Sequence, residues 1–400
     1  LKDRLELSTG VNALYAKHKG VANGWDGESV LDAMNYYNPT SPITKSDGTW
    51  SEGSGSQNYN PLSLINEDTS ETMYKRMQSI GKASLKIIDG LVWNMNYSYD
   101  NMQSTYSSYD SHNSQLPGLK DYNGRATRNT YFDDSQTFET FGNYDKTFNK
   151  VHKLSLMAGY SWEEKNNNDG FGLTVHNFFD DNLKWNNLTY AGAIDGMPAV
   201  QSGTKETIRN ISYYGRLSYS YNSKYMFQAT IRRDGSSVFG NGHRWGTFPS
   251  VSAAWNITEE SFMKNQNVFS NLKLRVGYGV TGNSGVGSYS AVSTYGATGS
   301  YFTYNGSSYV TLGATKLANP DLKWETTGML NIGVDYALVG GRINGSVEFY
   351  NKKTKDLIWN YPVSSFIYPF GSIPANVGEI TNTGIEFSLN ATAIKTKSFT

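Results

Sequence analysis

The sequence has no cysteine, no long apolar run and no excess of either charge. The absence of cysteine excludes disulfide bonds, thiolate metal sites and thiol catalysis. Because no stretch of about 18 consecutive apolar residues occurs, a transmembrane helix is excluded as well. The 35 basic and 35 acidic side chains cancel, so the net charge gives no reason to expect nucleic acid or anionic lipid as a partner.

Aromatic residues and glycine are abundant instead. The 400 residues include 29 Tyr, 18 Phe, 9 Trp and 40 Gly. This composition is typical of many strands joined by turns and solvated loops, and it suits a helical bundle poorly. The mean hydropathy of −0.53 would fit a soluble protein. It fits a transmembrane β-barrel equally well, because only alternate residues of such a barrel contact lipid.

The strongest local pattern is an alternation of apolar and polar residues. Residues 272–280 place apolar side chains on one face and Lys273, Arg275 and two glycines on the other. Residues 5–13, 330–338, 343–349 and 385–389 alternate in the same way. The pattern predicts strands with one apolar face, which a soluble β-sandwich would also have.

Two further features favour a membrane barrel over a sandwich. Tyrosine and tryptophan lie near the ends of the apolar faces, as in Tyr97, Tyr160 and Tyr219, which is typical of the aromatic girdles at a membrane interface. Charged residues such as Arg275 and Asp335 fall in mid-strand on the opposite face, where a water-filled lumen tolerates them. Arg or Lys facing lipid at mid-membrane would cost roughly 2–4 kcal/mol.

The lengths of the connections also indicate a barrel. Short turns alternate with longer loops, as short periplasmic turns and longer outer loops do in outer-membrane barrels. The segment 130–148 alternates least cleanly, because Phe138 and Phe141 fall on opposite faces. We therefore predict an all-β fold, a transmembrane antiparallel β-barrel, with about twelve strands at residues 3–16, 72–88, 91–106, 130–148, 152–164, 206–222, 225–236, 245–257, 270–281, 323–338, 341–355 and 380–396.

Four sequence motifs resemble the SusC/RagA family of TonB-linked outer-membrane transporters of Bacteroidetes. They are RRDGSSVFG at 232–240 with RWGTFPS at 244–250, LKLRVGYGVTGN at 272–283, NPDLKWETT at 319–327, and NVGEI at 376–380 with NTGIE at 382–386. The four motifs occur in the family's order and cover the latter half of the chain well. Residues 1–200 resemble the family more loosely.

The resemblance implies a larger protein than the residues themselves show. Members of the family look like 22-stranded barrels closed by an N-terminal plug. Residues 1–400 would then be the central part of a single outer-membrane β-barrel domain, with the plug and the terminal strands absent from this chain. The resemblance further implies a Gram-negative, Bacteroidetes-type outer membrane, a SusD-like surface lipoprotein, contact with TonB through the missing N-terminal part, and import of oligosaccharides or peptides.

No pattern in the sequence indicates catalysis, and we predict that the chain is not an enzyme. Gly277, Gly279 and Gly282 have dinucleotide-motif spacing, but no helix can start after them, so the context of that motif is missing. Adjacent acidic residues such as Asp133 and Asp134 point apart on a strand, unlike a glycosidase pair. The five histidines are too scattered for a metal site. No cofactor is predicted; calcium in an outer loop is left open.

Binding is the function that the long loops favour. Their aromatic rings can stack on sugars or enclose peptides, although rings of this kind can equally pack the loops together or contact a partner protein. We predict that substrate is bound by Trp25, Trp50, Trp185, Tyr301, Tyr304, Trp359 and Tyr361. Two rival functions remain: a passive porin, which needs no plug, and a surface adhesin barrel, which binds without uptake.

Overall fold

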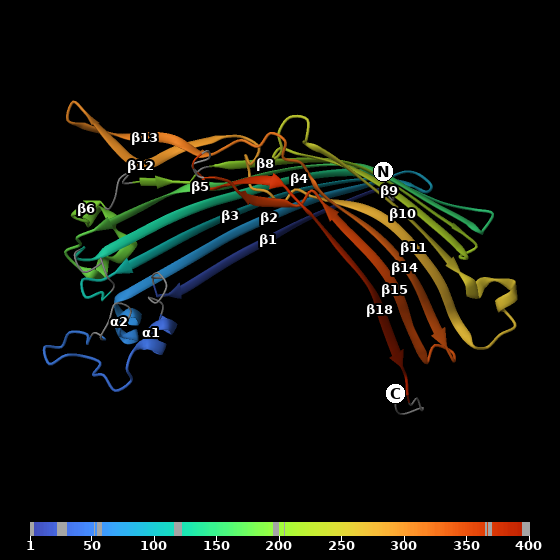
Figure 1. Cartoon of the computed structure of the whole chain (residues 1–400), viewed down its shortest axis with the longest axis horizontal. Helices are drawn as coiled ribbons and strands as arrows, with labels where there is room; N and C mark the ends of the chain where they lie inside the picture. Colours follow the sequence, from blue (N-terminus) through green and yellow to red (C-terminus); the bar gives the residue numbers. More distant parts are fainter. Residues whose placement is uncertain are drawn as a thin grey trace.

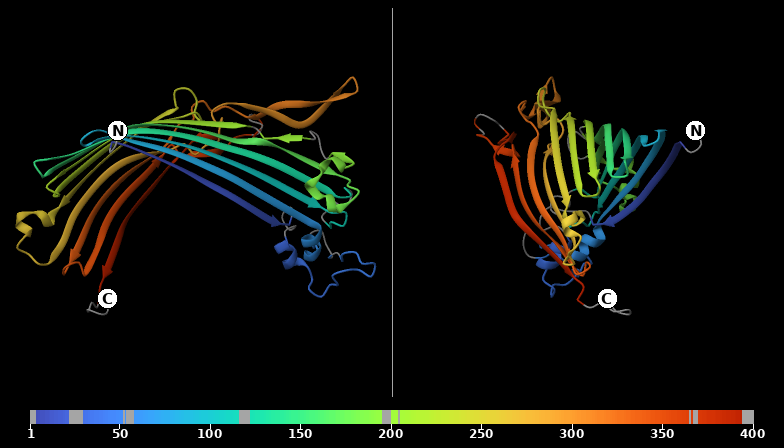
Figure 2. Two further views of the ribbon diagram at one scale, coloured as in Figure 1. Left: turned by 180° about the vertical axis from the view of Figure 1, so that it is seen from behind. Right: turned by 90° about the vertical axis from the view of Figure 1, so that its right-hand side faces the viewer.

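The chain forms one large, curved, antiparallel sheet (Figure 1). The computed structural model describes residues 4–21, 30–51, 53, 58–115, 122–194, 200–203, 205–364, 366 and 370–393. Twelve long strands follow one another in the order β1-β2-β3-β4-β5-β8-β9-β10-β11-β14-β15-β18. Seen from one end, the sheet is a trough with β1 and β18 at its two edges (Figure 2).

All twelve predicted strands are confirmed, and several extend further than their alternation indicated. The segment 130–148, the least regular of the predictions, lies inside an uninterrupted strand of 24 residues. The strands are β1 (Leu5–Gly20), β2 (Asp68–Ile88), β3 (Leu91–Asp110), β4 (Arg125–Phe148), β5 (His152–His176), β8 (Glu206–Tyr221), β9 (Tyr225–Ser236), β10 (Trp245–Asn256), β11 (Phe269–Asn283), β14 (Glu325–Leu338), β15 (Ile343–Lys355) and β18 (Glu379–Ala391).

The register sorts the side chains onto two chemically different faces. Leu274, Val334, Val347 and Phe387 are aligned across β11, β14, β15 and β18, on what we call the lipid face. On the opposite face, here called the lumen face, Arg275 of β11 binds Asp335 and Glu348. Because side chains alternate along a strand, a slip of one residue would turn this charged cluster toward lipid. The apolar pattern therefore fixes the register.

Short turns join the strands at one end of the sheet, and long segments join them at the other, as the sequence predicts. Between β2 and β3 the turn is Asp89–Gly90, and Gly90 has φ +87°. A Cβ at Gly90 would lie 2.5 Å from the carbonyl oxygen of Asp145, so only glycine fits. One turn is longer and contains the short helices η3 (Ile257–Glu259) and η4 (Ser261–Met263). Within the described residues, no helix is long and apolar enough to cross a membrane.

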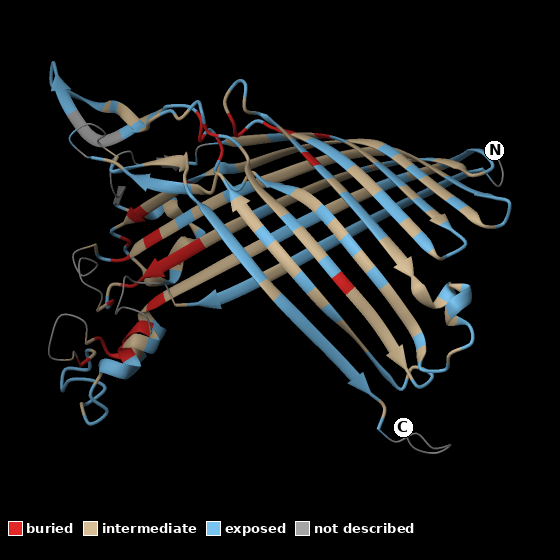
Figure 3. Ribbon diagram, turned by 45° about the vertical axis from the view of Figure 1, so that its right-hand side comes forward, coloured by how far each residue is buried: buried red, intermediate tan, exposed pale blue. Residues whose placement is uncertain are grey.

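The long segments contain structure that the sequence analysis treated as loop. They form α1 (Val30–Tyr36), α2 (Pro61–Glu67), η1 (Asp181–Asn186), η2 (Leu188–Tyr190), β6 (Ala193–Ile194) and β7 (Val200–Ser202), and two hairpins, β12–β13 (Thr294–Tyr304 and Ser307–Lys316) and β16–β17 (Ile358–Pro362 and Ser372–Asn376). Most buried residues gather at this end of the sheet, whereas the long walls are mostly exposed or half-buried (Figure 3). The sheet thus holds a folded layer of loops, here called the outer layer, at one end.

The charged cluster on the lumen face gives a direct test of the assigned faces. Arg275 contacts both carboxylates, and all three side chains are only a quarter to a third exposed. We expect Arg275→Met to leave Asp335 and Glu348 without their shared cation and to destabilise the barrel by about 1–2 kcal/mol, since water screens part of the interaction. The temperature of barrel unfolding on heat-modifiability gels measures this. Lys153→Met removes a lumen-face charge that forms no ion pair among the described residues, so an equal shift in both variants would contradict the prediction.

Candidate functional site

The family-like motifs meet at the outer layer, at the outer ends of β9, β10, β11 and β14. Val238, Phe239 and Leu322 are buried there in one small apolar cluster. The ring of Trp324 lies against this cluster, with its centroid 5.2 Å from that of Phe239 and 5.4 Å from that of Phe248. Its indole N–H donates to the carbonyl oxygen of Arg244 at 3.0 Å. Residues from two of the four motifs therefore close one junction.

Asn376 connects this junction to the hairpin β16–β17. Its side-chain oxygen accepts from the backbone N–H of Lys323 at 2.9 Å, and its amide donates to the carbonyl oxygens of Lys323 and Asp356, each at 2.8 Å. Asn319 donates in turn to the carbonyl oxygen of Pro374 at 2.7 Å. Two asparagine side chains thus bind backbone groups that no strand partner satisfies.

A polar cavity of about 390 Å³ lies beside the junction on the lumen face. The side chains of Glu139, Glu163, Arg232 and Asp234 line it together with Trp324. Arg232 binds Asp234 at 2.8 Å and the hydroxyl of Ser212 at 2.8 Å. Every charged side chain named here has a polar partner. We therefore assign the cavity to the hydrated wall of the lumen and not to a catalytic centre.

A second pocket, here called the Trp50 pocket, lies in the outer layer between residues 44–50 and residues 112–115. Its volume is about 670 Å³. The indole N–H of Trp50 donates to Glu67 Oε1 at 2.8 Å, which fixes the ring at the end of α2. The other lining side chains are hydroxyls, amides, one ammonium, one carboxylate and one imidazole: Thr44, Lys45, Asp47, Thr49, His112, Asn113, Ser114 and Gln115.

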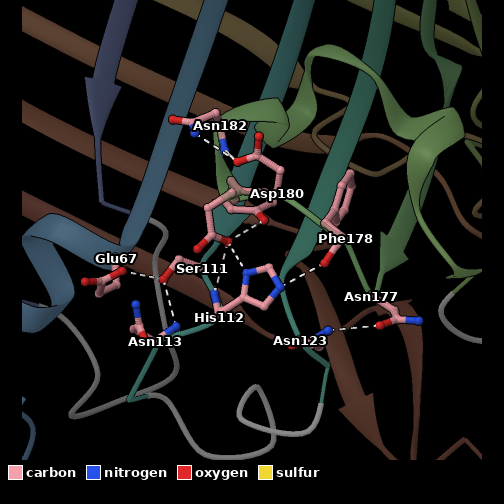
Figure 4. Close-up of polar contacts among 11 residues, drawn as sticks. Glu67, Ser111, His112, Asn113, Asn123, Asn177, Phe178, Asp180 and Asn182 are labelled. Carbon is pink, nitrogen blue, oxygen red and sulfur yellow. Dashed lines mark hydrogen bonds and ion pairs between the residues drawn. The ribbon is translucent and has the colours of Figure 1, made fainter. Parts of the chain in front are cut away.

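Hydrogen bonds between separate loops hold the floor of the Trp50 pocket (Figure 4). His112 contacts Asp181 through Nδ1 and the carbonyl oxygen of Phe178 through Nε2, at 2.8 Å. Tyr109 donates to the same Asp181 carboxylate at 2.7 Å. Ser111 donates to Glu67, so that the segments after α2, β3 and β5 form one unit. The pocket is therefore built by side chains from distant parts of the chain.

Two carboxyl groups are buried beneath the pocket. Asp68 and Asp110 face each other across β2 and β3, and both are buried. They lie about 20 residues from the Asp89–Gly90 turn, whereas a membrane-spanning strand needs only about 9–11, so they are outside the membrane. Burial raises the pKa of Asp68 to about 7. A hydrogen bond with Ser114 lowers the pKa, whereas the nearby carboxylates of Asp110 and Glu67 raise it further. Burial likewise raises the pKa of Asp110 to about 6, although Arg125 opposes it.

Of the seven predicted aromatic side chains, the five that the structure describes do not lie together in one site. Trp50 lines the pocket, and Trp185 packs partly buried against the cluster that contains Tyr109 and Phe178. Tyr304, Trp359 and Tyr361 are well exposed, on the two separate hairpins. Trp25 and the side chain of Tyr301 lie outside the described residues. The polar lining of the Trp50 pocket was missed, because threonine, asparagine and glutamine in a loop carry no distinctive pattern.

Comparison with known proteins agrees with this architecture. The family described as TonB dependent receptor-like, beta-barrel matches residues 17–400. The TonB-dependent receptor P39 of Formosa agariphila is 31% identical over 407 residues, which cover 99% of this chain and 36% of that protein. The TonB-dependent receptor SusC of Bacteroides thetaiotaomicron is 41% identical over 199 residues, covering 49% of this chain and 20% of SusC.

A solved structure extends the likeness to three dimensions. The RagAB peptide transporter matches with a TM-score of 0.83 at 22% identity, over 99% of this chain and 43% of the transporter chain. These relatives are named as receptors or transporters and not as enzymes, as the sequence analysis predicts. The chain spans little more than a third of the length of its full-coverage curated relatives. The alternating strands and the family match together show that the chain belongs to the TonB-dependent receptor β-barrel family.

Proposed function

We propose that the chain is part of a TonB-dependent importer of oligosaccharides, with peptides as the alternative substrate, in the outer membrane of a Bacteroidetes-type bacterium. One observation carries the proposal: curated TonB-dependent receptors match 99–100% of the chain at 30–31% identity. The sheet supports it as well. An unpaired strand edge is not tolerated in lipid, so the free edges of β1 and β18 are expected to pair with further strands of a larger, plugged barrel.

The proposed partner on the cell surface is a SusD-like lipoprotein, and TonB would supply the driving force through parts outside this chain. The hairpin β12–β13 supports a protein partner, because it is apolar yet exposed. Tyr295, Phe302, Tyr304 and Leu312 are 53–76% exposed. A two-stranded hairpin of this kind is only marginally stable in water. The two-protein name of the RagAB transporter fits such an arrangement.

The Trp50 pocket supports oligosaccharide as the substrate. An aromatic ring beside hydroxyl and amide groups suits a sugar, whose apolar ring face stacks while its hydroxyls form hydrogen bonds. Most of the lining groups are uncharged; Lys45 and Asp47 offset each other, and the carboxylate of Glu67 accepts from the Trp50 indole. Tyr304, Trp359 and Tyr361 are proposed to contact substrate or partner from the hairpins, while Trp185 has a packing role.

Deletion of the full gene tests the function in cells. The mutant strain is compared with its parent on single purified oligosaccharides and on peptides as the only carbon source, each with and without TonB. Loss of growth on one oligosaccharide, repeated by loss of TonB, is the expected result. Uptake that persists without TonB would indicate a passive porin, and binding without uptake would indicate an adhesin.

Substitution of Trp50 tests the pocket separately. With the substrate found in cells, we expect Trp50→Ala to weaken binding at least about tenfold, the loss typical of truncating an aromatic anchor. Trp50→Phe keeps a ring but loses the hydrogen bond to Glu67, so it should bind better than Trp50→Ala. Phe179→Ala is the control, because this ring is 75% exposed and does not line the pocket. Equal affinities of Trp50→Ala and Phe179→Ala in calorimetry would rule the pocket out.

A further inference from the structure

A row of three polar side chains, on β8, β9 and β10, lies on the lipid face near its outer limit. Tyr213 of β8, Arg233 of β9 and Thr247 of β10 are direct neighbours in the register, so all three project from the same face. All three are exposed. Arg233 is eight residues from Tyr225, the start of β9 at the short turn. A strand rises about 3.3 Å per residue and is tilted in a barrel, so eight residues reach from the short turn to the far side of the hydrocarbon layer and not only to its centre.

Aromatic rings hold the arginine in place. The ring of Trp245 stacks on that of Tyr213, with centroids 6.1 Å apart and planes at 27°. The guanidinium carbon of Arg233 lies 5.3 Å from the centroid of Trp245. Gly235 makes this arrangement possible, because a Cβ there would lie 2.9 Å from the Trp245 ring. The Trp245 ring therefore lies flat over Gly235 and presents its face to the guanidinium of Arg233.

The surface between this row and the short turns is apolar. Ile231 and Val251 follow on the same face, with exposed fractions of 55% and 44%, and Phe227 and Tyr278 continue it at 42% and 50%. Such side chains match the acyl chains of a lipid. A cation directly above them lies at the level of the lipid headgroups, where an arginine costs little.

Arg233 has no acidic partner within the part of the chain that the structure describes. The adjacent Asp234 points to the lumen face, where Arg232 binds it. A guanidinium with open N–H groups, a neighbouring phenol and the Thr247 hydroxyl are suitable donors for a phosphate, which arginine binds through two parallel hydrogen bonds. Because the acidic and basic side chains of the whole chain cancel, the net charge conceals this local cation and does not predict an anionic lipid here.

We propose that Arg233, Tyr213 and Thr247 bind the phosphate of an outer-leaflet lipid whose acyl chains lie on Ile231 and Val251. The site is a lipid-binding site on the outer wall of the barrel, distinct from the substrate route through the lumen. It rests on the transmembrane placement of the sheet and does not depend on which substrate is imported.

Native mass spectrometry of the detergent-solubilised full-length receptor tests the proposal. The probes are a bisphosphorylated lipid A, the same lipid without its phosphates, and inorganic phosphate. We expect the phosphorylated lipid to bind at least about tenfold more tightly than the dephosphorylated one, and Arg233→Gln to remove most of that difference. Arg233→Lys, which keeps the charge but loses the planar fork, should have an intermediate affinity.

Arg216→Gln is the matched control. Arg216 is also an exposed arginine of the sheet, but it pairs in register with Met157 and Thr230 on the lumen face. Its substitution should leave lipid binding unchanged, and heat-modifiability confirms that each variant is folded. The proposal is wrong if both lipids bind equally, or if Arg233→Gln and Arg216→Gln weaken binding alike. Displacement of the lipid by millimolar inorganic phosphate would identify a free-anion site and overturn the lipid assignment.

Discussion

Asn376→Ala is expected to detach residues 319–324 from the hairpin β16–β17. The substitution removes three hydrogen bonds, each to a backbone group of Lys323 or Asp356. At roughly 1 kcal/mol for each bond, the local loss is about 3 kcal/mol, which is comparable with the stability of one folded loop. Trp324 is the last residue of this segment and packs on Phe239, so its ring should lose its partly buried environment as well.

Hydrogen exchange by mass spectrometry measures this release in the purified full-length protein. Peptides that cover residues 319–324 should exchange on the order of 100-fold faster, whereas peptides from β14 should not change. Asn66→Ala is the control, since Asn66 is an exposed asparagine with a single side-chain bond to the carbonyl oxygen of Leu62. Unchanged exchange in Asn376→Ala would mean that apolar packing alone holds the junction.

The outer layer should be more stable in acid than at neutral pH. The pKa of Asp68 is raised from 3.8 to about 7, so the folded outer layer keeps a proton that the unfolded segment has already lost. The stabilisation is complete below pH 4 and declines as the pH rises to about 7, by on the order of 3–4 kcal/mol for this group. The raised pKa of Asp110, about 6, acts in the same direction.

Asp68→Asn separates this effect from general acid effects. The amide cannot ionise, so the variant should lose most of the decline between pH 4 and pH 7 and be more stable than the parent at neutral pH. Limited proteolysis of the outer layer, followed across this range with a pH-tolerant protease, measures the opening. Asp47→Asn is the control, because the pKa of this exposed carboxyl is lowered by contacts with Thr49. A parent protein whose opening is independent of pH would contradict the prediction.

The walls of the barrel could be predicted because they obey a local rule. The alternation over residues 272–280 predicts which side chains lie on the lipid face. It therefore placed Arg275 on the lumen face before its partners were known. The strands were predicted too short where they leave the membrane. Beyond that level both faces of β2 and β3 meet water or loops, and residues such as Thr69 and Ser108 carry no alternation.

The outer layer could not be predicted, because its contacts join residues far apart in the chain. His112 meets Asp181 and Phe178, which are 66–69 positions away, and no periodic pattern encodes such a meeting. Aromatic residue type selected both Trp50, which lines a pocket, and Trp185, which packs partly buried inside the layer. Residue type alone therefore does not separate a ring that lines a pocket from a ring that packs the loops together, whereas the fold does.

The excess length of the strands has a consequence for how a captured molecule behaves. β5 has 25 residues, and a bilayer needs only about 9–11 of them, so more than half of this strand stands beyond the lipid. A closed barrel with such strands surrounds a tall antechamber above the membrane. A molecule released there from the outer layer collides repeatedly with the same walls before it escapes, which raises its effective concentration over the entrance. The antechamber would therefore favour recapture of a released molecule over its loss to the surrounding water, without changing the equilibrium affinity of any single site.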